Sequence, residues 1–303
     1  MTRTVLALGG NALVERGAAS YADQRDTVRR TVDHLDPLRA GDRDVVFTHG
    51  NGPQVGNRLL EQEAAATETP TLPLDVLVAE TQGQLGYLLA NALDARWDET
   101  ALAISTRAVV DGDDPAFESP SKPVGPWYTE AEANRKPFET AAVGSGERPY
   151  RRVVASPRPR RIVERDRIDR LVGRGPVICC GGGGIPVVDA DDGFEERAAV
   201  IDKDYTSAVL GCHLDARELV FLTDVPCAYL DYGTHDQRPI ETVDPETLQA
   251  YIDRGEFGEG SMRPKAEACV AFVESGGERA VITRPADVEA ALAGTAGTRV
   301  RRA

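Results

Sequence analysis

Short apolar runs alternate with longer amphipathic segments along most of the chain. The apolar runs have the length of buried strands, and the amphipathic segments carry apolar residues at helical spacing. This alternation predicts an α/β fold of three layers, with helices on both faces of a mainly parallel sheet. The expected strands are 4–8, 44–48, 101–105, 176–180, 218–222 and 280–283, and the expected helices are 23–39, one beginning at Pro53, 75–97, 202–213 and 286–292.

The segment from Arg107 to Ala155 interrupts the alternation. It contains six prolines and no long apolar run. A loop of this length inside a compact domain is usually functional or disordered. Trp127-Tyr128 and the strand-like run 152–155 favour order. We therefore predict one domain over 1–303, with a small protruding subdomain inserted at 107–155 that acts as a lid.

The charge balance narrows the choice of partners. The chain has 303 residues, of which 41% are hydrophobic, and a net charge of −14. Because the basic residues form no stripe, nucleic acid is not an expected partner. Many carboxylates combined with few lysines also predict adaptation to a salt-rich cytosol, where charge repulsion is screened. An ordinary acidic protein is the alternative.

The cysteines and histidines show no pattern typical of a metal site. The five cysteines include no C-x-x-C pair, and we interpret them as small buried side chains in a reducing cytoplasm. The four histidines have no ligand spacing. No signal peptide is evident, and no apolar run reaches transmembrane length. A cytoplasmic protein without a protein-held metal or a membrane partner is expected.

Three of the predicted strands end in glycine-rich loops. These loops are Gly9-Gly10, Gly50-Asn51-Gly52 and Gly181–Gly184. Open parallel sheets bind ligands at the carboxyl ends of their strands, so the loops are expected at one edge. Glycine lets backbone N–H groups approach an anion, which predicts a phosphate site. The chain has no Walker A sequence and no dinucleotide-binding fingerprint, which argues against a P-loop enzyme and a dinucleotide dehydrogenase.

Lysine is rare in this chain, with only four lysines among 35 basic residues. Lys122, Lys203 and Lys265 lie in motifs rich in glycine, proline or aspartate, whereas Lys136 lies in an ordinary polar stretch. A lysine ammonium is a compact, mobile charge that can follow a phosphoryl group during transfer. The three motif lysines are therefore candidate active-site residues, and Lys136 is given no role. Genome base composition is the alternative explanation of the scarcity.

Carboxylates accompany two of these motifs. Asp202 and Asp204 flank Lys203 and are predicted to hold its ammonium group, although one aspartate could simply cap the helix that follows. Thr223-Asp224 forms a second acidic site directly after the strand 218–222. The segment 260–265, which contains Lys265, precedes a helix, and a capped helix start is the alternative there.

These motifs, in this order, resemble those of carbamate kinases of the amino acid kinase superfamily over nearly the whole chain. The matching stretches are Ala7–Leu13, Thr48–Gly56, Gln82–Tyr87, Lys122–Pro126, Gly181–Pro186, Ala199–Asp204, Leu222–Val225 and Gly260–Lys265. Related acid kinases carry a lysine just before the first Gly-Gly, where this chain has Leu8. In carbamate kinases a lysine of the protruding subdomain takes over that role, and Lys122 occupies this place.

The chain departs from the family pattern at three points. Arg263 stands where family members usually have glycine, and Pro226-Cys227 replaces an Asp-Gly or Asn-Gly pair in the nucleotide loop. Cys179-Cys180 replaces a pair of small residues before the glycines. None of these changes removes a charge that the reaction needs, so they affect the expected nucleotide contacts more than the chemistry.

The resemblance implies the amino acid kinase fold and reversible phosphoryl transfer between ATP plus carbamate and ADP plus carbamoyl phosphate, forming ATP in arginine catabolism. It implies that Lys122 and Lys203 stabilise the charge of the transition state and that Asp202 and Asp204 orient lysine. It also assigns Gly9, Gly10, Asn11, Gly50, Asn51, Gly52, Gly182 and Gly183 to the carbamate and the transferring phosphoryl group, and Lys203, Thr223, Asp224, Tyr232, Met262, Pro264 and Lys265 to the nucleotide.

Cofactor and oligomeric state follow from the same resemblance. Mg²⁺ is expected to arrive on the phosphates of ATP or ADP, with water completing its shell. A homodimer is also implied. Two alternatives stay open, namely another carboxylate or amino-acid kinase of the superfamily and a non-catalytic nucleotide-binding regulator. The missing lysine before Gly9 argues against the first, and the three motif lysines argue against the second.

Overall fold

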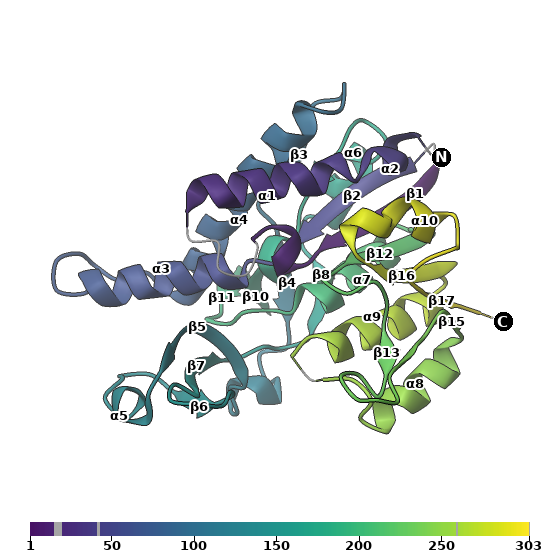
Figure 1. Ribbon diagram of the computed structural model, residues 1–303. Coiled ribbons are helices and arrows are strands. Elements are labelled where there is room, and N and C mark those ends of the chain that lie inside the picture. The colour runs from purple at the N-terminus through teal and green to yellow at the C-terminus, as the bar shows by residue number, and fades with distance from the viewer. Residues whose placement is uncertain (15–19, 41–42, 259, 303) are drawn as a thin grey trace.

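A sheet of eight strands forms the middle layer (Figure 1). The computed structural model describes residues 1–14, 20–40, 43–258 and 260–302. The strand order is β15-β17-β16-β12-β1-β2-β9-β3, and every neighbouring pair is parallel except β16–β17. The predicted mainly parallel sheet is therefore confirmed. Its strands are β1 (Thr2–Leu8), β2 (Arg43–His49), β3 (Leu102–Ala103), β9 (Val177–Ile178), β12 (Glu218–Leu222), β15 (Thr242–Val243), β16 (Arg279–Thr283) and β17 (Thr298–Arg301).

Helices cover both faces of this sheet. Alternate strand residues face opposite layers, so on β1 Leu6 and Leu8 belong to one apolar cluster and Val5 and Ala7 to the other. The predicted three-layer α/β architecture is confirmed, with α1 and α2 above the sheet and α8 and α9 below it in Figure 1. The first layer has α1 (Tyr21–Asp33), α2 (Asp36–Ala40), α4 (Leu74–Asp94) and α10 (Val288–Leu292), and the second has α7 (Lys203–His213), α8 (Pro245–Asp253) and α9 (Met262–Glu274).

The single helix predicted over 23–39 is wrong, because two helices occupy this range. α1 starts after Ser20, whose side chain accepts from the backbone of Asp23 in a capping box. The chain leaves the helix after Asp33 and enters α2 three residues later. Pro37 explains the break, since its ring would collide with the carbonyl of Asp33 in a continuous helix and it has no N–H to donate.

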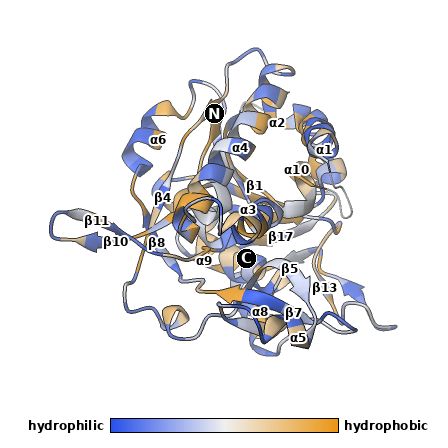
Figure 2. Cartoon of the chain, turned by 90° about the vertical axis from the view of Figure 1, so that its left-hand side faces the viewer, coloured by the Kyte–Doolittle hydropathy of each residue, from blue (hydrophilic) through white to orange (hydrophobic). Residues whose placement is uncertain are grey.

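A second, four-stranded sheet lies beside the main one, in the order β11-β10-β4-β8. Its strands are short and come from distant parts of the chain, so the hydrophobic pattern did not predict it. In Figure 2 its hairpin of β10 and β11 projects from the body. The strands are β4 (Arg107–Val110), β8 (Pro159–Ile162), β10 (Ile185–Ala190) and β11 (Gly193–Glu196), and α6 (Arg165–Leu171) follows β8.

A small antiparallel sheet, in the order β5-β7-β6, projects below the body together with α5 (Figure 1). We call residues 122–154, which contain these elements, the subdomain. They fall inside the insertion predicted at 107–155, whose first strand β4 pairs instead with β8 and β10. The extent of the insertion as a separate unit stays a prediction. The elements are β5 (Lys122–Tyr128), α5 (Glu130–Ala133), β6 (Thr140–Ala142) and β7 (Tyr150–Val154), and they lie against α3 (Gly52–Ala65).

Two short strands complete the regular structure near the C-terminal half. β13 (Tyr229–Leu230) and β14 (Arg238–Pro239) pair as a small antiparallel ribbon. Within the described residues, no helix is both long enough and apolar enough to cross a membrane.

Candidate active site

The carboxyl ends of neighbouring parallel strands form the floor of the candidate site. The Gly9 N–H donates to the carbonyl of Leu222 at 2.9 Å, and the Gly50 N–H donates to the carbonyl of Leu8 at 3.1 Å. The short helix η3 (Gly181–Gly183) follows β9, which pairs with β2. The three glycine-rich loops therefore lie at one edge of the sheet, as their positions after the strands predicted.

A close approach explains the glycine at position 182, and ordinary van der Waals contacts show what surrounds Gly50. Gly182 has a φ of 63°, and a Cβ there would collide with the side-chain amide of Asn51. A Cβ on Gly50 would lie 3.5 Å from Cδ of Lys203 and 3.9 Å from the backbone nitrogen of Gly10. The first two loops and the Lys203 side chain thus converge on one small space, and Gly182 packs against the second loop.

The remaining substrate-side candidates border this space. Gly52 is the first residue of α3, and a Cβ there would meet open space. The carbonyl of Gly183 accepts a 2.8 Å bond from the hydroxyl of Thr206 on α7. Asn51 is buried and donates its side-chain amide to Thr81 at 2.9 Å. Asn11 lies in η1 (Gly10–Ala12), and its side chain lies outside the described residues.

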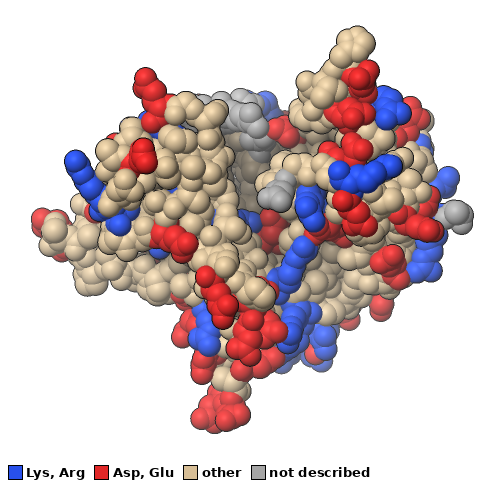
Figure 3. Space-filling model, turned by 90° about the horizontal axis from the view of Figure 1, so that it is seen from below, with Lys and Arg blue, Asp and Glu red and all other residues tan. Residues whose placement is uncertain are grey.

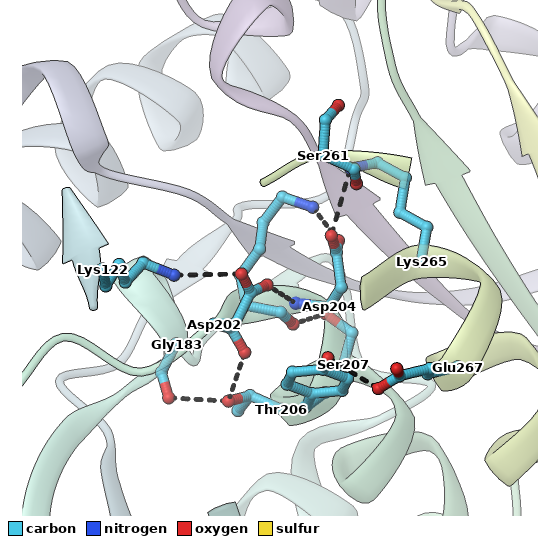
Figure 4. A network of polar contacts seen from close by, with 11 residues as sticks. Lys122, Gly183, Asp202, Asp204, Thr206, Ser207, Ser261, Lys265 and Glu267 are labelled. Atoms are coloured by element: carbon cyan, nitrogen blue, oxygen red, sulfur yellow. Dashed lines mark hydrogen bonds and ion pairs between the residues drawn. The ribbon is translucent and has the colours of Figure 1, made fainter. Parts of the chain in front are cut away.

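Three lysines from three separate elements meet two aspartates of α7 (Figure 4). Lys122 of β5 contacts Asp202 with 2.9 Å between Nζ and Oδ2. Lys203 contacts one carboxylate oxygen of Asp204, and Lys265 of α9 contacts the other at 3.1 Å. Asp202 also accepts a 3.0 Å bond from the backbone N–H of Asp204, so it caps the helix as well. Asp202 is thus a helix cap, but the lysine that it pairs with is Lys122 and not Lys203, whose ammonium Asp204 holds.

Burial and pairing act against each other in this group. Burial alone would raise the pKa of Asp202, but Lys122, the Asp204 N–H and Lys203 hold that pKa well below its usual range. Burial lowers the pKa of Lys203, with Asp204 opposing and Lys265 reinforcing the shift. Burial also acts to lower the pKa of Lys265, yet the nearby Asp204 raises it overall. Asp204 is therefore the shared counter-ion of the two lysines.

A cavity of about 310 Å³ lies on the α9 side of the charged group. The side chains of Tyr232 and Met262 line it, as the resemblance implied, whereas Pro264 is buried within α9 and is not among its lining residues. Thr223 donates to Asp224 at 3.2 Å at the edge of the sheet, and Asp224 also lines the cavity. Figure 3 shows the molecule hollowed between two parts when it is seen from below, with basic side chains at the margin of the hollow.

Comparisons with known proteins agree with this geometry. The model of the amino acid kinase family matches residues 2–284. The chain is 49% identical to the carbamate kinase of Halobacterium salinarum over 99% of this chain and 98% of that protein. It is 43% identical to the carbamate kinase of Pyrococcus furiosus, with 98% of each covered. The chain belongs to the carbamate kinases of the amino acid kinase family.

A solved structure supports the same assignment for the fold. The carbamate kinase from Giardia lamblia bound to AMP-PNP superposes with a TM-score of 0.91 at 35% identity, over 100% of this chain and 99% of that one. The amino acid kinase fold and the kinase class predicted from the sequence are confirmed.

Sequence reasoning missed a carboxylate that carbamate kinase motifs do not include. Glu267 of α9 accepts from the hydroxyl of Tyr205 at 2.8 Å, from Arg158 at 2.5 Å and from Arg263 at 2.8 Å. Arg263, a departure from the family pattern, thus forms an ion pair with a carboxylate one turn further along its own helix. The i,i+4 spacing of Arg263 and Glu267 was visible in the sequence, but the approach of Tyr205 and Arg158 was not.

His49 was also missed as part of the site. It ends β2, is 1% exposed, and its Nδ1 lies 3.0 Å from the Gly50 carbonyl. Burial lowers the pKa of His49 to about 4, a shift that the Gly50 contact opposes and Lys203 reinforces. A neutral ring therefore lies beneath the glycine loop. A Cβ on Gly181 would lie 2.5 Å from that ring, which explains the glycine there.

Proposed function

We propose that this chain catalyses reversible phosphoryl transfer between ATP plus carbamate and ADP plus carbamoyl phosphate, and that it forms ATP in arginine catabolism. The observation that carries the proposal is the meeting of Lys122, Lys203 and Lys265 around two aspartates beside the glycine loops. Phosphoryl transfer needs positioning and charge neutralisation more than covalent chemistry, and this group supplies both. The arginine pathway follows from the family resemblance.

The substrate side of the proposal uses backbone donors. Gly10 and Gly52, with the Asn11 and Asn51 backbones, would present N–H groups to the carbamate and the transferring phosphoryl group. Gly9 and Gly50 would border the same group without donating to it, because their N–H groups bond the carbonyls of Leu222 and Leu8. The side chain of Lys203 reaches this space, since its Cδ and Cε lie next to Gly50. Gly182 and Gly183 allow the third loop to pack against Asn51 and α7 without side chains in the way.

The charged side chains divide into two roles. Lys122 and Lys203 neutralise charge on the phosphoryl group in the transition state, and the subdomain acts as the lid that delivers Lys122. In the described residues the Lys122 ammonium is held by Asp202. Asp204 keeps Lys203 charged and oriented. The step itself is an in-line transfer from one oxygen to another, with no covalent enzyme intermediate.

The nucleotide side uses α9 and the end of β12. Lys265 neutralises nucleotide phosphates, Thr223 and Asp224 border them, and the cavity lined by Tyr232 and Met262 takes the nucleoside. Pro264 shapes the start of α9 from within. No group of three or more possible metal ligands occurs in the part of the chain that the structure describes. Because Asp202 and Asp204 are bonded to lysines, a Mg²⁺ ion held by the nucleotide phosphates and water fits this site; when bound, it would neutralise phosphate charge.

Three further features complete the proposal. The five cysteines are free thiols, which supports a reducing cytoplasm. The homodimer follows from the family resemblance. The net charge of −14 supports adaptation to high salt.

One assay tests the reaction and the salt adaptation together. The purified chain is supplied with ADP and carbamoyl phosphate, with ATP and carbamate, and with ATP and N-acetylglutamate, each over a KCl series. Turnover is expected with the first two pairs only, rising with KCl. Turnover of N-acetylglutamate, or ATP binding without turnover, would exclude the proposed reaction. Activity that is highest without salt would exclude only the salt adaptation.

A further inference from the structure

Lys136, the lysine to which the sequence assigns no role, connects the subdomain to the body of the molecule. Its Nζ lies 2.5 Å from Oε2 of Glu63 on α3 and 4.4 Å from the ring centre of Tyr128. The hydroxyl of Tyr128 donates to the other carboxylate oxygen of Glu63 at 3.0 Å. One carboxylate of the body is thus occupied by two side chains of the subdomain. Charge-assisted bonds of this kind are stronger and more directional than neutral ones.

This contact is sheltered from water. The side chains of Lys136 and Glu63 are 24% and 22% exposed, and Tyr128 is 4% exposed. Most ion pairs on this acidic surface are more exposed and would be weakened by salt. The Glu63 contact is less open to such screening, so it can hold the subdomain in the salt-rich medium that we propose.

An apolar contact lies beside the ion pair. Val124 of β5 and Val154 of β7 share a buried cluster with Val55 and Leu59 of α3. At its centre the two backbones almost touch, since a Cβ on Gly56 would lie 3.1 Å from Cα of Gly125. The subdomain therefore rests on α3 along β5, with the Glu63 contact at one end of that strand.

The two ends of β5 carry the two kinds of contact. Lys122, the first residue of the strand, bonds Asp202 of α7, and Tyr128, the last, bonds Glu63 of α3. Gly125 lies on Gly56 between these two ends, where the register of β5 against β7 also shifts. A displacement of the Tyr128 end would therefore turn the strand about this contact and move the Lys122 end.

We propose that Glu63 and Lys136 are positioning residues that set the orientation of β5 and thereby place the ammonium of Lys122 in the active site. The inference rests on the proposed function, in which Lys122 neutralises the phosphoryl group. The two can nevertheless be tested apart, because the position of β5 is measurable without turnover.

The kinetic test is a double-mutant cycle of Lys136→Met and Lys122→Ala. Lys136→Met alone lowers kcat between about 10-fold and 100-fold, the range for a displaced catalytic group, while the KM for ADP stays within about threefold because the nucleotide cavity lies on α9. In the Lys122→Ala background the same change lowers kcat by less than about twofold. If the two effects multiply instead, Lys136 does not act through Lys122 and the inference is wrong.

Arg135→Met is the matched control. Arg135 is a basic residue of the same subdomain, directly before Lys136, and its side chain is exposed. Its replacement should leave kcat unchanged. An equal loss in both variants would show that removing any positive charge from the subdomain has this effect, which would overturn the specific role of Lys136.

The structural test is amide hydrogen exchange, which needs no substrate. Lys136→Met should speed exchange of the β5 amides and leave exchange in the main sheet unchanged, whereas Arg135→Met should change neither. Unchanged exchange in β5 would overturn the inference even if kcat falls.

If Lys136→Met does not fold, Tyr128→Phe removes only the hydroxyl bond to Glu63 and is expected to show the same changes at a smaller size. An inactive wild-type protein would refute the proposed function, while the exchange result would still decide whether the contact holds β5.

Discussion

The four lysines occupy two contrasting environments. Lys203 and Lys265 lie in the body of the molecule, are 9% and 6% exposed, and share the single carboxylate of Asp204. Lys122 and Lys136 lie on the subdomain, with side chains about a quarter exposed, and each pairs with a carboxylate on a helix outside the subdomain. In the body, then, burial holds the lysine ammonium groups in position. On the subdomain, contacts between separate elements hold them in position.

The difference indicates how the proposed reaction divides its work. A buried counter-ion keeps Lys203 and Lys265 in one place whether or not a substrate is bound. Lys122 can exchange Asp202 for a phosphoryl group at lower cost, since both side chains are already partly in water. The buried pair would thus provide a fixed phosphate site. The subdomain would provide the positive charge of Lys122, which reaches the phosphoryl group last.

The largest effect is expected from Asp204→Asn. This change leaves two buried ammonium groups next to each other with no carboxylate, and breaking a buried pair in this way costs about 3–5 kcal/mol of unfolding free energy. Urea unfolding at one pH and one KCl concentration measures the loss. Asp202→Asn is the matched control, because asparagine keeps the helix cap and the Lys122 pair is partly exposed. It should cost less than Asp204→Asn, because the ion pair that it weakens is partly exposed. Equal losses in the two variants would contradict the contrast between body and subdomain.

The next effect concerns catalysis. Lys122→Ala should lower kcat by on the order of 10²–10³, which is about 2.7–4 kcal/mol of transition-state stabilisation. The unfolding free energy should change little, because the Lys122 side chain lies at the edge of the buried group. Steady-state kinetics with ADP and carbamoyl phosphate, together with the unfolding curve, measure both quantities. A kcat within a few-fold of wild type would mean that the subdomain lysine is not the one that neutralises the phosphoryl group.

The sequence predicted the parts of this molecule that depend on neighbouring residues. The glycine loops follow their strands directly, so the parallel pattern was enough to bring Gly9, Gly50 and Gly181 to one edge of the sheet. The Asp202-Lys203-Asp204 run predicted a held lysine for the same reason. Pro37, by contrast, was present in the sequence and its effect on the helix 23–39 was overlooked.

The contacts that were missed join residues far apart in the chain. Glu63 and Lys136 are 73 positions apart, and Lys122 and Asp202 are 80 apart. No periodicity or spacing relates such residues, because their approach depends on how the subdomain packs on α3 and α7. The resemblance to a known family assigned Lys122, but it contained nothing about Lys136. A lysine in an ordinary polar stretch of sequence can therefore occupy a sheltered ion pair.

The third prediction concerns pH, and its effect should come from histidines of the body. His49 is buried with a pKa lowered to about 4 from its usual 6.5. Between these two pKa values the unfolded chain therefore binds the proton more readily than the folded chain does. The stability that neutral His49 contributes is complete above pH 6.5 and is lost as the pH falls toward 4. The slope is about 1.4 kcal/mol per pH unit. Unfolding free energies of wild type and His49→Asn across this range measure it, and the variant should show a flatter curve.

The control for this prediction is His235→Asn, since the His235 side chain is fully exposed. His213, on α7, has a pKa that burial lowers as well, so some slope of the same sign should remain in His49→Asn. No histidine occurs between residues 107 and 155, so the subdomain contributes no titration of this kind. If, as the pH falls over this range, amide exchange became faster in β5 before it did in the main sheet, acid would be weakening the Glu63 contact first. That result would mean that the subdomain, and not the body, is the more pH-sensitive of the two lysine environments.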